Sequence, residues 1–151
     1  MKRFRFSLRS VAVLRAHREL RAREAFSAAV NAFVAAEQTL ATVRARVAAF
    51  EAALATGRST KFSAAEEARA LTVYREECAA ERQTEEAVVA ARNTMGQRRA
   101  EYLEAHRGLE VVKRLEEKAR LLHRVAQNRE EQAEFDDYAG RRHSRRASLS
   151  V

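Results

Sequence analysis

The sequence contains no proline and no tryptophan, and it has only four glycines and one cysteine among 151 residues. Proline and glycine are the residues that most often interrupt helices, so their scarcity favours long uninterrupted helices. A single cysteine, Cys78, excludes a disulfide within the chain and a cysteine-rich zinc site. These absences, together with many alanines, glutamates and arginines, predict an all-α protein of the reducing cytosol.

Long apolar runs are also missing. No stretch approaches the about 20 consecutive apolar residues that span a bilayer, and the opening MKRFRFSLRS lacks the apolar core of a signal peptide. Aromatic residues make up 7% of the chain and charged residues 33%. This balance suits a thin rod with a narrow buried stripe better than a thick globule. The regular spacing of the apolar residues argues against disorder.

The net charge of +8 is concentrated at the two ends of the chain. Residues 1–23 contain eight lysines and arginines and a single acid, Glu19, while residues 141–151 contain four arginines and no acid. The long middle segment carries a small acidic excess. Five acids fall within residues 130–137, so an acidic block is followed directly by a basic tail.

A heptad pattern of apolar residues predicts a first helix over about residues 7–55. Two sets of residues recur every seven positions, as at the a and d positions of a coiled coil, which form the apolar seam that faces a partner helix. Towards the N-terminus the register loosens, because Arg15 and Glu19 would enter this seam. The seam residues are Phe26, Ala29, Phe33, Ala36, Leu40, Val43, Val47, Phe50 and Leu54.

A break is expected at residues 56–62, where Gly57 favours the end of a helix. Ser63 and Glu66 then form S-A-A-E, the pattern of a capping box. In such a box the serine hydroxyl accepts an amide hydrogen bond and the glutamate reaches back to the serine. The same pattern also arises by chance in a glutamate-rich chain.

A longer second helix is expected over about residues 63–139, followed by a basic tail at residues 140–151. Charged residues would occupy its seam between residues 81 and 99, so we expect that part to be loosely packed, wet or locally irregular. These charged residues are Glu81, Glu85, Arg92 and Arg99, and the apolar seam residues around them are Leu71, Tyr74, Cys78, Val88, Met95, Tyr102, His106, Leu109, Val112, Leu115, Ala119, Leu122 and Val125.

Two such helices with a short connection must form an antiparallel coiled-coil hairpin, so the predicted fold is all-α with residues 1–151 as one coiled-coil domain. Counted from the turn, Ser7 is expected opposite Leu109–Val112, and the second helix overshoots the first by about 25 residues, or roughly 40 Å. A lone charged helix of that length is marginal in water. Phe135 and Tyr138 on the overshoot would lack an internal partner, which indicates a partner outside the molecule.

Motifs for catalysis or cofactor binding are missing: the sequence has no P-loop, GxGxxG, HExxH or GxSxG. Adjacent glutamates such as Glu116 and Glu117 point about 100° apart on a helix, so they do not converge on one substrate. His106 and Cys78 occupy seam positions, where packing explains them more simply than ligand binding. A two-helix rod also offers no large concave pocket. We therefore expect no enzyme, no cofactor and no metal site.

The basic N-terminus places Phe4 and Phe6 among lysines and arginines, a composition that also occurs in proteins binding nucleic acid or anionic membranes. The acids of the body and of residues 130–137 argue against extensive phosphate contacts. Docking to a protein is the interpretation we favour, and an ordinary solvated terminus is the simpler alternative.

Both ends of the chain resemble the flagellar export protein FliJ family. The N-terminal MKRFRFSLRSVAVLRAHRE has a basic-aromatic start, an F-x-F-x-L unit and then a spaced L-R and E. The C-terminal LEVVKRLEEKARLLHRVAQNREEQAEFDDYA has K-R-L-E followed by E-x-Q and D. The length and the inequality of the helices are similar as well. Injectisome stalk proteins of the YscO type look alike, and the sequence does not clearly separate the two branches.

The resemblance implies a soluble cytoplasmic component of the flagellar type III export apparatus, similar to the central stalk of rotary ATPases. Such a protein binds the hexameric export ATPase, promotes its assembly or activity, contacts the cytoplasmic domain of the export gate membrane protein, and is linked to recycling of export chaperones. It would lie at the inner face of the cell membrane through these partners, without a cofactor or nucleic acid.

The resemblance also indicates where the partners bind. Residues that match its terminal patterns are expected to face the ATPase, and the turn end is expected to face the gate on geometric grounds alone. The predicted ATPase-facing residues are Phe4, Phe6, Leu8, Leu14, Arg15, Glu130, Gln132 and Asp137, and the predicted gate-facing residues are Lys61, Phe62, Val73 and Tyr74.

Two other classes of protein remain open at this point. A purely structural coiled coil, self-associating or belonging to an injectisome-type system, would need no ATPase and would tolerate loss of residues 1–20. A coiled coil that binds membrane surfaces or nucleic acid through its basic ends would bind in a salt-sensitive way.

Overall fold

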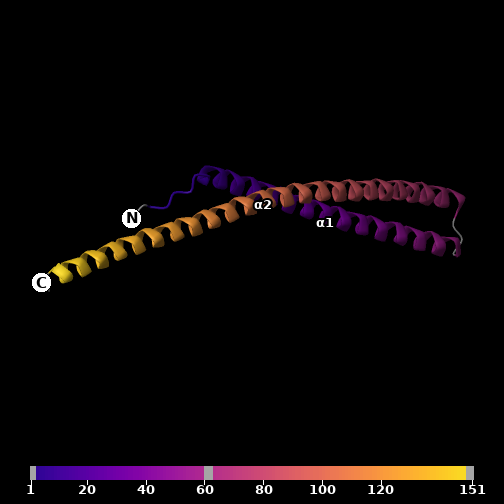
Figure 1. Cartoon of the computed structure of the whole chain (residues 1–151). Helices are drawn as coiled ribbons and strands as arrows, with labels where there is room; N and C mark the ends of the chain where they lie inside the picture. Colours follow the sequence, from indigo (N-terminus) through magenta and orange to yellow (C-terminus); the bar gives the residue numbers. More distant parts are fainter. Residues whose placement is uncertain (1–2, 60–62, 149–151) are drawn as a thin grey trace. The chain divides into compact units, whose positions relative to one another are not determined.

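The computed structural model describes residues 3–59 and 63–148, with side chains up to residue 143. Within these ranges the chain forms two α-helices and no strand: α1 spans Arg9–Ser59 and α2 spans Ala64–Ser148. The helices pack against each other as a helical hairpin (Figure 1). The predicted all-α fold is therefore confirmed.

The chain divides into two compact units, and each unit contains part of both helices. The turn unit is Glu19–Ala105, which carries the connection between the helices. The terminal unit combines Met1–Arg18 with His106–Val151. That residues 1–151 behave as one coiled-coil domain stays a prediction.

The predicted heptad seam of α1 forms the contact with α2 in the turn unit. Ala29, Val43 and Val47 are buried, and the other predicted seam residues of α1 are half-buried. The rings of Phe26 and Tyr102 stack across the helices, with centroids 6.1 Å apart and an interplanar angle of 10°. Each helix has a single neighbour in this unit, so even the seam residues keep part of their surface in water.

The charged positions of α2 do not make the helix irregular, so of the three expected outcomes (loose packing, a wet seam or local irregularity) the last was wrong. α2 is continuous through residues 81–99, because long charged side chains reach past the seam to its edge. Nε of Arg44 donates to Glu81 at 3.1 Å and Nη2 donates to Glu85 at 2.7 Å. The hydrogen bonds to Glu85 and Glu81 raise the pKa of the Arg44 guanidinium.

Arg92, another of the charged residues at these positions, contacts an aromatic ring of α1. The guanidinium of Arg92 lies over the ring of Phe33, 5.6 Å from its centroid, and is held there by cation–π attraction. A third cross-helix pair joins Nε of Arg46 to Glu77 at 3.4 Å. Arg99 is exposed. The charged positions of this seam thus make contacts with α1 at its edge, and loose packing of the seam stays a prediction.

The end of α1 differs from the expectation. α1 passes through Gly57 and ends at Ser59, because Gly57 falls three residues after Leu54, on the seam, where it is buried. The glycine therefore allows close packing of the helices instead of stopping α1. Near the turn, Nε of Arg58 donates to Glu67 at 2.9 Å.

The capping box at the start of α2 is confirmed. The Ser63 amide donates to Glu66 Oε2 at 3.0 Å and the Ser63 hydroxyl donates to the same atom at 2.7 Å. The Glu66 amide donates back to the Ser63 hydroxyl at 3.4 Å. These bonds lower the pKa of Glu66, chiefly through the Ser63 hydroxyl, and they satisfy amide groups that a helix start leaves without partners.

Because α1 ends at Ser59 instead of near residue 55, the turn comes later in the chain than expected, and this shifts the pairing between the helices. In the terminal unit Phe4 contacts Arg120 and His123, so Ser7 lies beside a part of α2 beyond the expected Leu109–Val112. The shift has a simple cause, because each residue by which the turn moves along the chain displaces the opposite partner by two residues.

The end of α2 also differs from the expectation. α2 continues through Gly140 to Ser148, so residues 140–148 are helical rather than a tail beyond Ala139. A Cβ atom added at Gly140 would meet nothing within 4 Å. A solvated glycine weakens a helix by only about 1 kcal/mol, and no proline follows to end it.

Replacing Ser63 with alanine should lower the melting temperature of the protein by roughly 2–4 °C at pH 7, because the cap of α2 is lost. The folded pKa of Glu66 lies below its unfolded value, so its share of the cap is present above about pH 4.3 and is lost as the pH falls through the folded pKa. The difference in melting temperature, measured by circular dichroism, should therefore shrink below that pH. A constant difference from pH 7 to pH 3 would contradict the bonded capping box.

Replacing Gly96 with alanine should stabilise the protein by about 0.5–1 kcal/mol, because the added methyl group raises helix propensity. A Cβ atom there meets nothing within 4 Å. Gly108→Ala is the comparison: its Cβ would lie 2.5 Å from Nη1 of Arg15, so that side chain must move and the gain should be smaller. Denaturant unfolding gives the free energy of unfolding of both variants. An increase for Gly108→Ala equal to or larger than that for Gly96→Ala would contradict the prediction.

Candidate protein-docking surface

An extended segment precedes α1 in the terminal unit. Residues 3–6 have no helical hydrogen bonds, and the first bonds of α1 run from the Arg9 amide to the Phe6 carbonyl at 3.3 Å and from the Ala12 amide to the Leu8 carbonyl at 2.9 Å. This extended stretch lies beside α2, and we call it the N-terminal segment (residues 3–8; Figure 1).

Phe4 anchors the N-terminal segment to α2. Its ring meets the His123 ring edge-on, with centroids 5.4 Å apart and an interplanar angle of 72°. The guanidinium of Arg120 lies 5.5 Å from the centre of the same ring. Arg120 is fixed in turn by two hydrogen bonds to Glu116, of 3.2 and 2.6 Å. Ring and cation–π contacts of this kind contribute about 0.5–1 kcal/mol each, which holds the segment without burying it.

An open groove of about 900 Å³ lies between the N-terminal segment, the first turns of α1 and α2. Its floor is apolar and its rim is mainly basic. One rim charge, Lys113, donates to Glu110 at 3.1 Å, and this bond lowers the pKa of Glu110. The residues that line the groove are Phe4, Arg5, Phe6, Arg9, Ala12, Val13, Ala16, Leu109, Lys113, Glu116 and Arg120.

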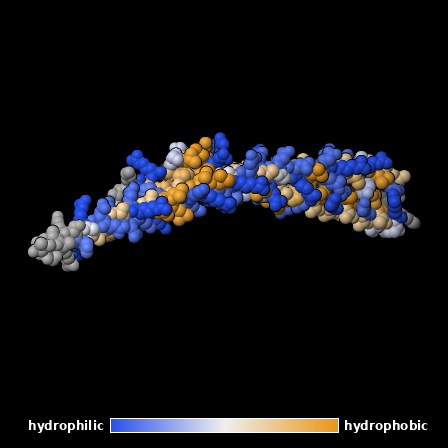
Figure 2. Space-filling model, viewed as in Figure 1, coloured by the Kyte–Doolittle hydropathy of each residue, from blue (hydrophilic) through white to orange (hydrophobic). Residues whose placement is uncertain are grey.

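Most of the exposed large apolar side chains of the described residues belong to the terminal unit, and Figure 2 shows an orange patch over it. Solvated single apolar residues are ordinary, but a gathered group of them marks an interaction surface. We call this group the exposed apolar set. It consists of Leu8, Val11, Val13, Leu14, Val111, Leu115, Leu121, Leu122, Val125, Phe135 and Tyr138.

The α2 members of this set overturn part of the predicted seam. Leu115, Leu122 and Val125 were expected to face α1, but they are 45%, 63% and 48% exposed. The heptad continues instead through Leu109, Val112, Glu116, Ala119 and His123, all of which are buried or half-buried. The packing of the helices keeps this spacing, so polar residues enter the seam and the leucines turn outward.

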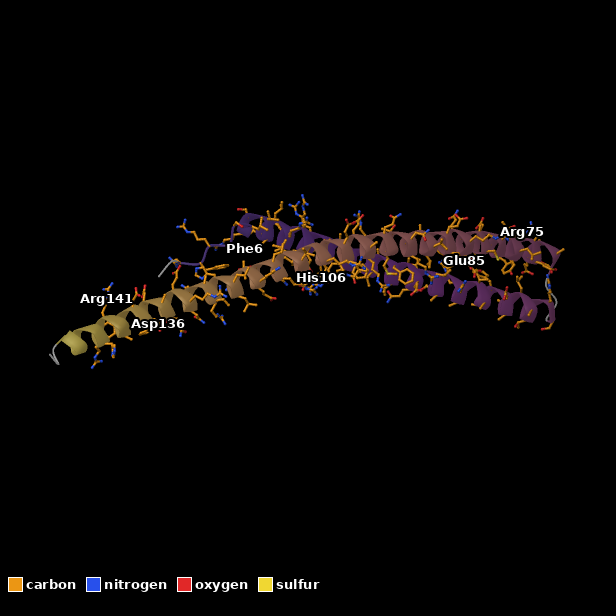
Figure 3. All side chains as sticks on the ribbon, in the orientation of Figure 1. Phe6, Arg75, Glu85, His106, Asp136 and Arg141 are labelled. Atoms are coloured by element: carbon orange, nitrogen blue, oxygen red, sulfur yellow. The ribbon has the colours of Figure 1, made fainter. Side chains whose placement is uncertain are left out.

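Beyond Gln127 every described side chain of α2 is exposed, up to His143. The side chains of this extension project into open space, as Figure 3 shows around the labelled Asp136 and Arg141. Phe135 and Tyr138 are 73% and 67% exposed. These two aromatic rings are therefore exposed, as the sequence predicted, and that a partner outside the molecule covers them stays a prediction.

The structure places the predicted ATPase-facing residues in two groups of the terminal unit. Phe4 and Phe6 are half-buried in the groove. Leu8, just before α1, and Leu14 and Arg15, in its first turns, are exposed. The second group lies on the extension of α2, away from this groove, and all of its members are exposed: Glu130, Gln132 and Asp137.

The sequence analysis did not identify the α2 side of this candidate docking surface. Arg120 and His123, which clamp Phe4, and Leu115 and Leu122, which face outward, were not singled out as partners. The heptad is the signal that could have found these residues. If polar residues are accepted at seam positions, the seam runs through Leu109, Val112, Glu116, Ala119 and His123, and Leu115 and Leu122 then face outward.

The predicted gate-facing residues are less well placed as a group. Lys61 and Phe62 lie outside the described residues. Val73 is 38% exposed. Tyr74 is half-buried, and its hydroxyl donates to Glu51 of α1 at 2.8 Å, a bond that raises the pKa of Tyr74. Val73 is thus the member that offers free surface.

No group of three potential metal ligands occurs among the residues that the structure describes. Over the same residues, neither α1 nor α2 contains an apolar stretch sufficient to span a bilayer. Cys78 is a half-buried free thiol. What the terminal unit does offer is an anchored aromatic segment, a basic-rimmed groove and outward-facing leucines, which suit contact with another protein.

The family model described as "Flagellar FliJ protein" matches residues 4–148, nearly the whole chain. No curated protein and no solved structure matches it significantly.

Replacing Phe4 with alanine should release the N-terminal segment from α2, because both contacts to Arg120 and His123 use its ring. Losing two contacts of this size raises the open population of the segment about tenfold. Trypsin should then cleave after Arg5 several-fold faster, as followed by mass spectrometry. Phe135→Ala is the matched control, since it removes an equal ring from the extension and should leave this cleavage rate unchanged. An unchanged rate in the Phe4 variant would contradict the anchor.

Proposed function

The chain belongs to the flagellar FliJ family, the non-catalytic components of flagellar type III protein export, and we propose that its terminal unit docks on the hexameric export ATPase. In this role the protein acts as a stalk that promotes assembly or activity of the ATPase. The exposed apolar set of the terminal unit is the observation that carries the proposal.

Surface composition supports a protein partner for this unit. Its first part, residues 3–18, carries five arginines and no acid, whereas the turn unit has almost equal numbers of acidic and basic residues. Exposed leucines beside arginines give both apolar area and long-range attraction to an acidic surface. A ring of six identical ATPase subunits would present its contact surface six times.

The groove and the extension suggest how the stalk is held. Phe4 keeps the N-terminal segment on α2, so Leu8, Leu14 and Arg15 are presented on a fixed surface rather than on a loose arm. Preorganisation of this kind lowers the entropy lost on binding. Glu130, Gln132 and Asp137 extend the contact along α2 and add charges of the opposite sign.

The turn unit is the proposed contact with the cytoplasmic domain of the export gate. Val73 supplies exposed apolar surface there, and Lys61, Phe62 and Tyr74 belong to the same end in sequence. Through these partners the protein would lie in the cytoplasm at the inner face of the membrane, and it would assist recycling of export chaperones. The binding of these partners by the family is the basis for this part of the proposal.

The experiment is ATP turnover by the purified hexameric export ATPase of the same organism, titrated with this protein. We expect stimulation by the native chain. In the double variant Leu115→Ser and Leu122→Ser the half-maximal concentration should rise at least about tenfold, since burying a leucine contributes about 1.5–3 kcal/mol.

A matched control changes two exposed valines of the turn unit, Val34→Ser and Val89→Ser, which are 44% and 58% exposed. This control should stimulate as the native protein does. Circular dichroism verifies that both double variants keep their helices. Absence of stimulation and binding by the native chain would overturn the stalk proposal and favour a purely structural coiled coil. If both double variants weaken the stimulation of ATP turnover equally, the terminal unit is not the docking surface.

A further inference from the structure

Along one face of the α2 extension, the charged residues are acidic before Tyr138 and basic after it. At 100° per residue, this face spans about 120° of the helix. It begins with acids, carries two aromatic rings in the middle and ends with arginines. All its residues are exposed, and a shallow hollow lies over its first four. We call it the reversing face, and it consists of Glu131, Glu134, Phe135, Tyr138, Arg141 and Arg142.

The residues of this face are placed symmetrically about Tyr138. Phe135 and Arg141 stand three residues before and after it, and Glu134 and Arg142 stand four before and after. The symmetry continues in the sequence, where Glu131 stands seven residues before Tyr138 and an arginine stands seven after. Each acidic or aromatic position is therefore matched by a basic position at the same distance.

We propose that the reversing face is an interface between two copies of this chain, packed antiparallel about a two-fold axis at Tyr138. In this arrangement Glu134 of one copy lies beside Arg141 of the other, on the same edge of the interface, and the pair occurs twice because the axis repeats it. On the other edge Phe135 lies beside Arg142 in two cation–π contacts, and the two Tyr138 rings meet on the axis.

The orientation follows from the same charges. A parallel pair would place Glu134 against Glu134 and Arg142 against Arg142, and like charges in facing positions are repelled. The opposite side of the extension does not share the pattern: Asp136, about 160° from Tyr138, is matched by Gly140, and Asp137 is matched by Ala139. Self-complementarity is thus a property of this one face.

The paired stretch is short, so its buried surface falls below the about 1,200 Å² of stable interfaces. We expect weak association at low salt, and weaker association at high salt because exposed ion pairs are screened. The pairing does not depend on the ATPase. It would instead compete with a partner that uses the apolar residues of the extension, since Phe135 and Tyr138 belong both to the exposed apolar set and to the reversing face.

Sedimentation velocity of the full chain, up to about 1 mM and at low and high salt, tests the pairing. The native chain should form a salt-sensitive dimer. Glu134→Arg should weaken it at least about tenfold, since two ion pairs become two repulsive contacts. Asp136→Arg is the matched control, with the same charge change two residues away on the opposite side, and should leave the dimer intact. A native chain that stays monomeric at all concentrations overturns the proposal, and so does equal weakening by both variants.

A charge-swapped pair gives a positive test. One chain carries Glu131→Arg and Glu134→Arg, so its reversing face is wholly basic, and the other carries Arg141→Glu and Arg142→Glu. Each alone should be monomeric, and an equimolar mixture should form a heterodimer at low salt. Failure of the mixture to associate, with both chains helical by circular dichroism, overturns the proposed register.

Disulfide trapping tests the orientation, in a background where Cys78→Ser removes the native thiol. A chain with Phe135→Cys should cross-link to a chain with Arg142→Cys in preference to itself. Preferred cross-links between two copies of the same variant would mean parallel pairing and would overturn the two-fold arrangement. Asp136→Cys, on the opposite side, is the control for random collision and should cross-link with neither.

Discussion

Register between α1 and α2 is the constraint on which the other features of this protein depend. Two helices that meet along a single seam have no third element to correct their alignment, so the turn and the heptad together decide every contact. Gly57 lies on the seam and lets α1 continue to Ser59. The later turn sets the partners of Glu51 and Arg44 in the turn unit and of Phe4 in the terminal unit.

The same register distributes polar and apolar surface differently in the two units. In the turn unit the seam receives apolar side chains from α1, and the charges of α2 reach its edges as ion pairs. In the terminal unit the seam receives Glu116 and His123, and Leu115 and Leu122 are turned to solvent. The protein thus places apolar surface outside at the part where partners are proposed to bind, without any change in helix geometry.

Much of the fold could be predicted from the sequence because its strongest signals are local. The heptad from Phe26 to Leu54 and the Ser63 cap each depend on a few neighbouring residues, and both were confirmed. The turn position could not be derived, since Gly57 favours a helix end locally and is retained in the helix by packing. Leu115 and Leu122 were misassigned for a related reason: hydrophobicity alone favours burying leucine, and only the partner's register shows that Glu116 and His123 face inward.

Among the residues that the structure describes, no large side chain is fully buried, and this has a consequence for the thermodynamics of the chain. Heat capacity of unfolding grows with the apolar area that unfolding exposes. A pair of helices with half-buried seams exposes little new apolar area per residue, so the heat-capacity change and the denaturant sensitivity per residue are small. The stability curve is therefore shallow, and the fold varies little in free energy over a broad range of temperature.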